Sequence, residues 1–210
     1  SETLLMEIVV RELRETQEKY GDPRRTEIID AEGDFEIEDL IADEDVAITV
    51  SNTGYIKRTA VTEYRNQKRG GKGRIGMRTR GEDFLTQLFV ASTHAYILIF
   101  SDRGRVYWLK VHRIPDVGPD GRGKSIANLV KMAPDEKIAA LQTIRDFPQV
   151  DGERFVVMGT RRGIVKKTDL RAFRHPRADG VIAARVRSDD AVVGAELSDG
   201  KGQVLLGTRE

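Results

Sequence analysis

Apolar residues recur at helical spacing only near the start of the chain, and at strand-like spacing beyond about residue 45. The first stripe, with Glu and Arg on the opposite face, predicts a helix over residues 3–20. Its apolar positions include Leu5, Val9, Leu13 and Tyr20. Gly21 and Pro23 are typical of the end of a helix. The rest of the chain is rich in β-branched residues and predicts a mostly β protein.

The β region repeats itself. An apolar strand, a glycine-bearing turn and a second strand occur over residues 46–59, 97–109 and 155–168, and a fourth copy begins at residue 204. Gly54, Gly104 and Gly163 occupy the same place in each turn, 50 and 59 residues apart. A hairpin loop needs a positive φ at such a position, which glycine adopts without strain. The pattern predicts successive copies of one structural unit.

Further strands are predicted between the hairpins. They cover residues 84–92, 137–144, 181–186 and 191–197, and one more short strand is predicted before the first hairpin, at residues 26–31. Each repeat therefore carries about four strands, as a propeller blade does. We predict about three and a half blades, an incomplete disc preceded by a short α-helix.

Charge is strongly segregated along the 210 residues, although the net charge is only +1. Residues 27–56 contain ten acidic and no basic side chains, whereas residues 57–81 contain nine basic side chains and one acidic one. Such blocks create local electrostatic fields that the small net charge conceals. The acidic residues 32–45 predict a folded, solvated surface, or alternatively an internal competitor for a basic site. With no cysteine, no signal pattern and no membrane span, a cytoplasmic location is expected.

One loop concentrates positive charge on very little side-chain bulk: residues 67–73, Gln-Lys-Arg-Gly-Gly-Lys-Gly. Glycines there let backbone N–H groups and cations approach a phosphate chain closely. Loops at residues 118–124 and 175–180 occupy the same place in the later repeats. Repeated loops point the same way, so their cations should follow one rim of the disc, which suits a bent polyanion.

The loop at residues 67–73 resembles the basic box of the gyrase A protein family, usually written Q-R-R-G-G-K/R-G, with Lys68 where arginine is common. Residues 51–58 and 18–26 also resemble that family, and the likeness covers nearly the whole chain. The resemblance implies that residues 1–22 are the end of the DNA breakage–reunion region and a linker. It also implies that residues 23–210 form a partial C-terminal β-pinwheel, which is a disc whose blades exchange strands.

The resemblance to DNA gyrase also implies a function, which is to wrap duplex DNA around the basic rim of an ATP-dependent type II topoisomerase that introduces negative supercoils. The implied partners are DNA, a second copy of the gyrase A chain and the gyrase B chain, in a bacterial nucleoid-associated enzyme without membrane contact. ATP and magnesium would belong to the B chain, and no cofactor is expected here. None of the tyrosines lies in the motif of the DNA-cleaving tyrosine, so no catalytic residue is expected.

The residues predicted to bind DNA are the box and cations near the equivalent loops. They are Gln67, Lys68, Arg69, Gly70, Gly71, Lys72, Gly73, Arg74, Lys57, Arg58, Arg65, Arg122, Lys124, Lys166, Lys167, Arg174 and Arg177. Within the box, Lys68, Arg69 and Lys72 are expected on phosphates, and Gln67 on a phosphate or on the loop itself.

Three alternatives stay open. The chain could be the C-terminal domain of the related topoisomerase IV A chain, in which the box is absent or degenerate. The second alternative is a P-loop-like nucleotide-binding enzyme, because residues 118–125 match the pattern G-x-x-x-x-G-K-S, although no buried strand precedes them. A propeller that binds only proteins is the third, and negligible DNA affinity would distinguish it. The three scattered histidines show no metal-binding spacing.

Overall fold

The structure is a computed structural model that describes residues 2–22, 26, 37–64, 77, 81–118 and 121–207. The chain divides into two units, residues 1–36 and 37–210. In the first unit, helix α1 spans Glu2–Tyr20 and confirms the predicted helix. Its apolar side chains are exposed, Leu5 and Leu13 among them. Residues 27–31, where a strand was predicted, lie outside the described residues.

The second unit is built from short strands joined by tight turns. The strands are β1 Asp45–Ser51, β2 Tyr55–Ala60, β3 Leu85–Ser92, β4 Tyr96–Ser101, β5 Arg105–Lys110, β6 Lys124–Ser125, β7 Ile138–Ile144, β8 Phe155–Thr160, β9 Val165–Asp169, β10 Val181–Ile182 and β11 Val192–Ser198. Single 3₁₀ turns lie at Ile37–Leu40, Val61–Glu63, Val111–Arg113, Ile126–Asn128 and Leu170–Phe173.

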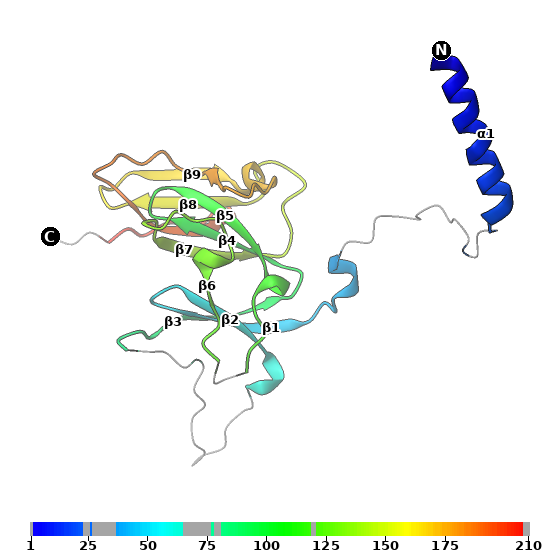
Figure 1. The fold of residues 1–210 in the computed structure, drawn as a ribbon. Coiled ribbons are helices and arrows are strands. Elements are labelled where there is room, and N and C mark those ends of the chain that lie inside the picture. The colour runs from blue at the N-terminus through cyan, green and yellow to red at the C-terminus, as the bar shows by residue number, and fades with distance from the viewer. Residues whose placement is uncertain are drawn as a thin grey trace. The chain divides into compact units, whose positions relative to one another are not determined.

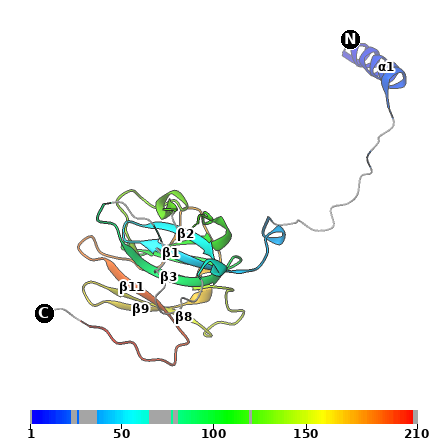
Figure 2. The same cartoon turned by 90° about the horizontal axis from the view of Figure 1, so that it is seen from below.

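The strands form three antiparallel sheets that follow the three repeats (Figure 1). The first blade has the strand order β3-β1-β2-β6, the second β7-β4-β5-β10 and the third β11-β8-β9. In each blade a hairpin is flanked on one side by a returning strand, β3, β7 or β11. Figure 2 shows β1, β2 and β3 side by side, with β8, β9 and β11 in a separate layer. The predicted blade-type β fold is therefore confirmed, with three blades among the described residues.

Neighbouring blades share strands. Strand β6 follows β5 in sequence but pairs with β2 of the first blade, and β10 follows β9 but pairs with β5 of the second. Each repeat thus supplies the last strand of the blade before it. We call the edge opposite β3, β7 and β11 the outer edge; it is formed by β6, β10 and, in the third blade, β9.

The predicted strand at residues 181–186 was too long, because only Val181–Ile182 pair with a neighbour. The backbone N–H groups of Ala183 and Ala184 donate to the carbonyl of Gly104, which turns the chain away from the sheet. The fourth hairpin is not seen in the described part either. Residues 204–207 carry no strand and their apolar side chains are exposed, since nothing among the described residues pairs with them.

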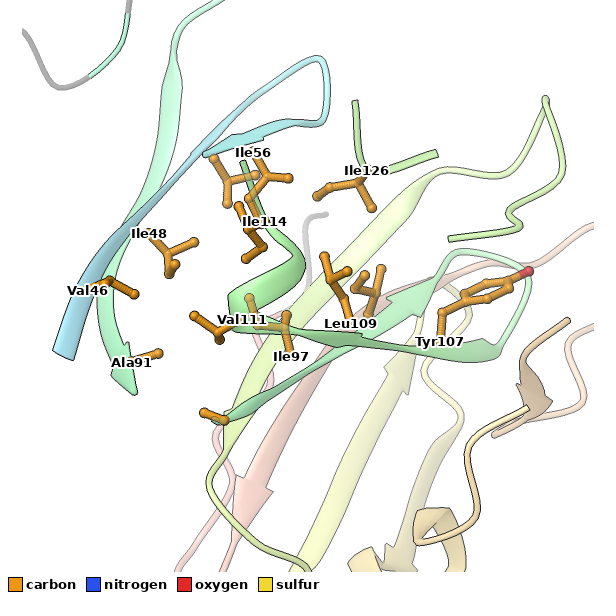
Figure 3. Packing of buried hydrophobic residues seen from close by; sticks show 13 residues of the cluster. Val46, Ile48, Ile56, Ala91, Ile97, Tyr107, Leu109, Val111, Ile114 and Ile126 are labelled. Atoms are coloured by element: carbon orange, nitrogen blue, oxygen red, sulfur yellow. The ribbon is translucent and has the colours of Figure 1, made fainter. Parts of the chain in front are cut away.

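Two hydrophobic cores lie between the blades. Between the first and second blades, Ile48 and Ile56 pack with Ile97, Leu109 and the 3₁₀ residues around Ile126 (Figure 3). Between the second and third, the next residues along β4 point the other way: Leu98 and Phe100 contact Val156 and Met158. The middle sheet is buried on both faces, so β4 is a continuous apolar run without alternation.

Candidate nucleic-acid interface

The strand-exchange junctions shape the outer edge. Gly54 and Gly104 have φ near +80° in their hairpins, and their carbonyls accept the N–H groups of Ile126 and Ala183, which follow β6 and β10. Gly123 and Gly180 precede those strands with φ of +79° and +70°. A Cβ at Gly123 would lie 2.2 Å from the carbonyl oxygen of Ile56. Only glycine permits that approach, so the glycines of the equivalent loops hold the exchanged strands in place.

The predicted basic box lies outside the described residues. This covers Arg65 and Gln67, Lys68, Arg69, Gly70, Gly71, Lys72, Gly73 and Arg74. By sequence the box occupies the place in the first repeat that residues 118–124 occupy in the second, after the hairpin and before the returning strand.

Lys57 does not reach the surface, contrary to the prediction. It is fully buried on β2, and its Nζ donates to the carbonyl of Gly118 over 2.9 Å. A buried ammonium must be paired, and here it ties a crossing loop to the sheet. Arg58 is largely covered as well: its Nε donates to the Ile114 carbonyl over 2.9 Å, and its Nη2 lies 4.0 Å from Asp116.

Arg122 and Lys124 lie at the outer edge of the first blade. Lys124 is exposed and pairs with Ile56 in the sheet. The guanidinium carbon of Arg122 lies 3.7 Å from the centre of the Tyr55 ring, a cation–π contact. Within the described part of the chain neither side chain has a carboxylate partner. Sequence reasoning found both cations but missed Tyr55, because only the pairing of β6 with β2 brings Tyr55 next to Arg122.

The predicted cations of the third repeat are all exposed. The Nζ of Lys166 donates to the Ala183 carbonyl over 2.6 Å, and that of Lys167 lies 3.9 Å from the centre of the Phe155 ring. Arg174 contacts His175, and Arg177 stands on the turn before β10. The surface of the third blade therefore carries several cations that hold no carboxylate among the described residues.

Acidic side chains cover other cations. Glu38 lies 2.6 Å from Lys110, and Asp43 lies 2.5 Å from Arg145. The Ser92 hydroxyl donates to Asp43 and lowers the pKa of that carboxyl, with a smaller contribution from Arg145. The described residues 37–44 of the acidic segment are thus folded against the blades, as predicted.

The nucleotide-binding pattern at residues 118–125 is not a P-loop. Lys124 and Ser125 form a strand, and only the 3₁₀ turn Ile126–Asn128 follows, whereas a P-loop must open an α-helix. A pocket of about 630 Å³ lies among the β1–β2 turn, β3 and the start of β7; Ser125 lines it, but Arg122 and Lys124 do not. The described residues contain no cluster of three or more His, Asp or Glu that could hold a metal ion.

Tyr107 is the most perturbed titratable side chain near the second exchange junction. It is 2% exposed and its hydroxyl donates to Glu136 over 2.6 Å. Burial, followed by the hydrogen bond and the charge of Glu136, raises the pKa of Tyr107 to about 12. A neutral tyrosine so placed is a packing group, and it offers no chemistry at neutral pH.

Three consecutive antiparallel blades that exchange edge strands, with cations along the outer edge, define a propeller-type domain. A family model described as the DNA gyrase C-terminal domain, β-propeller, matches residues 45–92, 95–145 and 154–199, one match for each blade. The chain belongs to this family, and the resemblance inferred from the sequence is confirmed.

Individual relatives agree. The chain is 47% identical over 204 residues to the DNA gyrase A protein of Streptomyces coelicolor and 43% identical over 202 residues to that of Haemophilus influenzae, covering 95% and 96% of this chain. These matches span 24% and 23% of the relatives, so the chain covers about a quarter of their length.

Solved structures show the same fold. The C-terminal domain of a DNA topoisomerase IV matches with a TM-score of 0.63 and 30% identity, over 76% of this chain and 47% of that one. A DNA gyrase A C-terminal domain matches with a TM-score of 0.59 and 22% identity, over 74% and 48%. Among the described residues, no helix is both long and apolar enough to cross a membrane.

Proposed function

We propose that this chain binds and wraps duplex DNA along the outer edge of its blades, through phosphate contacts, as part of a DNA gyrase. The family match across all three blades carries the proposal. It is supported by the exposed cations Lys124, Lys167 and Arg177, and by the basic box that the sequence contains at residues 67–73. Contacts of such cations with phosphates do not depend on the base sequence. Any preference among DNA sites would therefore come from how easily the duplex bends.

The whole protein's activity follows as part of the proposal. It is ATP-dependent negative supercoiling by an assembly of two gyrase A chains and two gyrase B chains, in which the B chains hold ATP and magnesium. This chain contributes DNA binding and no catalytic residue.

The A chain of a topoisomerase IV is the second candidate, because the 30%-identical solved structure comes from that enzyme. The box favours gyrase, since its seven residues differ from the gyrase pattern only at Lys68.

The test is a ligation assay on nicked circular DNA. A chain that wraps DNA with a fixed hand leaves, after ligation, a linking-number change of one sign. The variant with Lys68, Arg69 and Lys72 changed to Ala should lose most of that change, and its salt slope in a binding titration should fall by about three.

The matched control changes Lys131, Lys137 and Lys201 to Ala, three exposed lysines outside the box. This control removes the same charge, so it separates the box from net charge. Equal losses in both triple variants would reject the box assignment. Binding that is negligible at moderate salt would reject DNA wrapping and favour a propeller that binds only proteins.

A further inference from the structure

The outer edge of the first blade contains a contact between two strands that are distant in sequence. Tyr55 begins β2 and pairs with Ser125 of β6, and the guanidinium carbon of Arg122 lies 3.7 Å from the centre of the Tyr55 ring. Gly123, at φ +79°, turns the chain between Arg122 and β6. The position of Arg122 is therefore set by the exchanged strand and by the aromatic ring together.

The contact leaves the guanidinium nitrogens of half-buried Arg122 without a protein partner among the described residues. The Nε of Arg122 is buried without a hydrogen-bond partner, and among the described residues no carboxylate or carbonyl pairs with the terminal nitrogens. By contrast, Arg103, Arg145, Arg162 and Arg171 each contact an aspartate. Lys124 follows two residues later and is exposed, so two unneutralised cations stand together at this edge.

The equivalent junction of the second blade is arranged differently. Arg105 takes the place of Tyr55, and Asp179 takes the place of Arg122. The Nη2 of Arg105 donates to the carbonyls of Asp179 and Gly180, the second over 3.3 Å. In the second blade, Arg105 therefore fastens the exchanged strand β10. In the described part of the first blade, no arginine donates a hydrogen bond to the backbone at the junction with β6, and Arg122 makes only the contact with the Tyr55 ring.

We propose that Tyr55 is a positioning residue for DNA binding: it pre-organises Arg122, which together with Lys124 forms a phosphate clamp at the outer edge of the first blade. A guanidinium held by stacking keeps its donor fork fixed and loses less side-chain entropy when it meets a phosphate. Tyr55 itself need not touch DNA. This inference rests on the proposed DNA-binding function and names one of its sites.

The test is a double-mutant cycle in this chain, measured as duplex-DNA affinity over a range of salt concentrations. Arg122→Gln should lower the salt slope by about one, because one phosphate contact is lost. Tyr55→Leu should weaken binding about two- to fivefold, the range that a cation–π contact at a partly exposed site supports. In the Arg122→Gln background Tyr55→Leu should change nothing further, and Tyr55→Phe, which keeps the ring, should bind as the unaltered chain does.

Lys137→Gln is the control, because Lys137 is an exposed lysine next to β7, at the edge opposite β10. It should leave the slope unchanged. If Tyr55→Leu weakens binding equally with and without Arg122, Tyr55 acts through packing and the inference is wrong while DNA binding stands. If the unaltered chain does not bind DNA, the proposed function and this inference fail together.

Discussion

The second strands of the three hairpins have related sequences but very different surroundings. In the first two blades, residues 55–60 and 105–110 show the same burial pattern along the strand, with the second and third residues fully covered. In the third blade, Ile164, Val165 and Lys166 occupy the same positions and are all exposed. Two things differ. Ile56 and Val106 pack in cores against the next blade, and β6 and β10 close the first two outer edges, whereas no described strand or blade does either at β9. Burial of a blade's outer edge is thus supplied by its neighbour and not by its own sequence.

The largest effect is expected at the hairpin glycines. Gly104 and Gly163 both have φ near +80°. A Cβ on Gly104 would lie 2.2 Å from the carbonyl oxygen of Ala184, whereas one on Gly163 meets nothing within 4 Å. Gly163→Ala should therefore cost only backbone strain, about 1 kcal/mol, and Gly104→Ala about 3 kcal/mol or more, because the exchanged segment must move.

Urea unfolding followed by the fluorescence of Trp108, the single tryptophan, measures both variants. Trp108 lies on β5 and its Nε1 donates to the Phe173 carbonyl over 2.9 Å, so it reports the contact of the second and third blades. Equal losses of stability in the two variants would show that the exchanged segment does not constrain Gly104.

The second effect depends on pH. Tyr107 is buried under the closed edge of the second blade, and its counterpart in the third, Lys166, is exposed. The pKa of Tyr107 in the folded protein, about 12, lies above its unfolded value of about 10. The neutral phenol therefore stabilises the fold fully below pH 10, and this contribution of at most about 3 kcal/mol should be lost as the pH rises from 10 to 12.

Tyr107→Phe has no proton to lose, so its stability should fall less than that of the unaltered chain between pH 9 and 12. Tyr20→Phe, on the exposed face of α1, serves as the control and should follow the unaltered chain. Parallel pH profiles for all three proteins would show that Tyr107 ionises freely in the folded state.

Local signals explain what could be predicted from sequence. A glycine that must adopt a positive φ, flanked by apolar runs, identifies a hairpin without knowledge of its neighbours, and the three hairpins were found in this way. Of the two exchanged strands, β6 was not predicted and β10 was predicted too long, because two residues such as Val181 and Ile182 are too few to show a period. Their pairing depends on a different blade.

The same limit applies to the candidate site. A lysine on a strand suggests a surface position, and nothing near Lys57 in the sequence shows that the chain at Gly118 crosses over it. The box could be recognised from its motif alone, because it is contiguous. The contact between Tyr55 and Arg122 joins two repeats, so it becomes visible only when the exchanged strand is in place.

The smallest effect compares two valines at equivalent positions, Val106 on β5 and Val165 on β9. Val106 pairs with Val181 of β10 and is fully buried in the core of the second and third blades, whereas Val165 is 45% exposed. Val106→Ala should cost about 2 kcal/mol, because it removes buried methyl groups and leaves a cavity, whereas Val165→Ala should cost about 1 kcal/mol or less. Urea midpoints of both variants give the comparison at constant unfolding slope. Equal costs would mean that β9 is covered in solution, and that the open edge of the third blade is already closed by another part of the molecule or by a second copy.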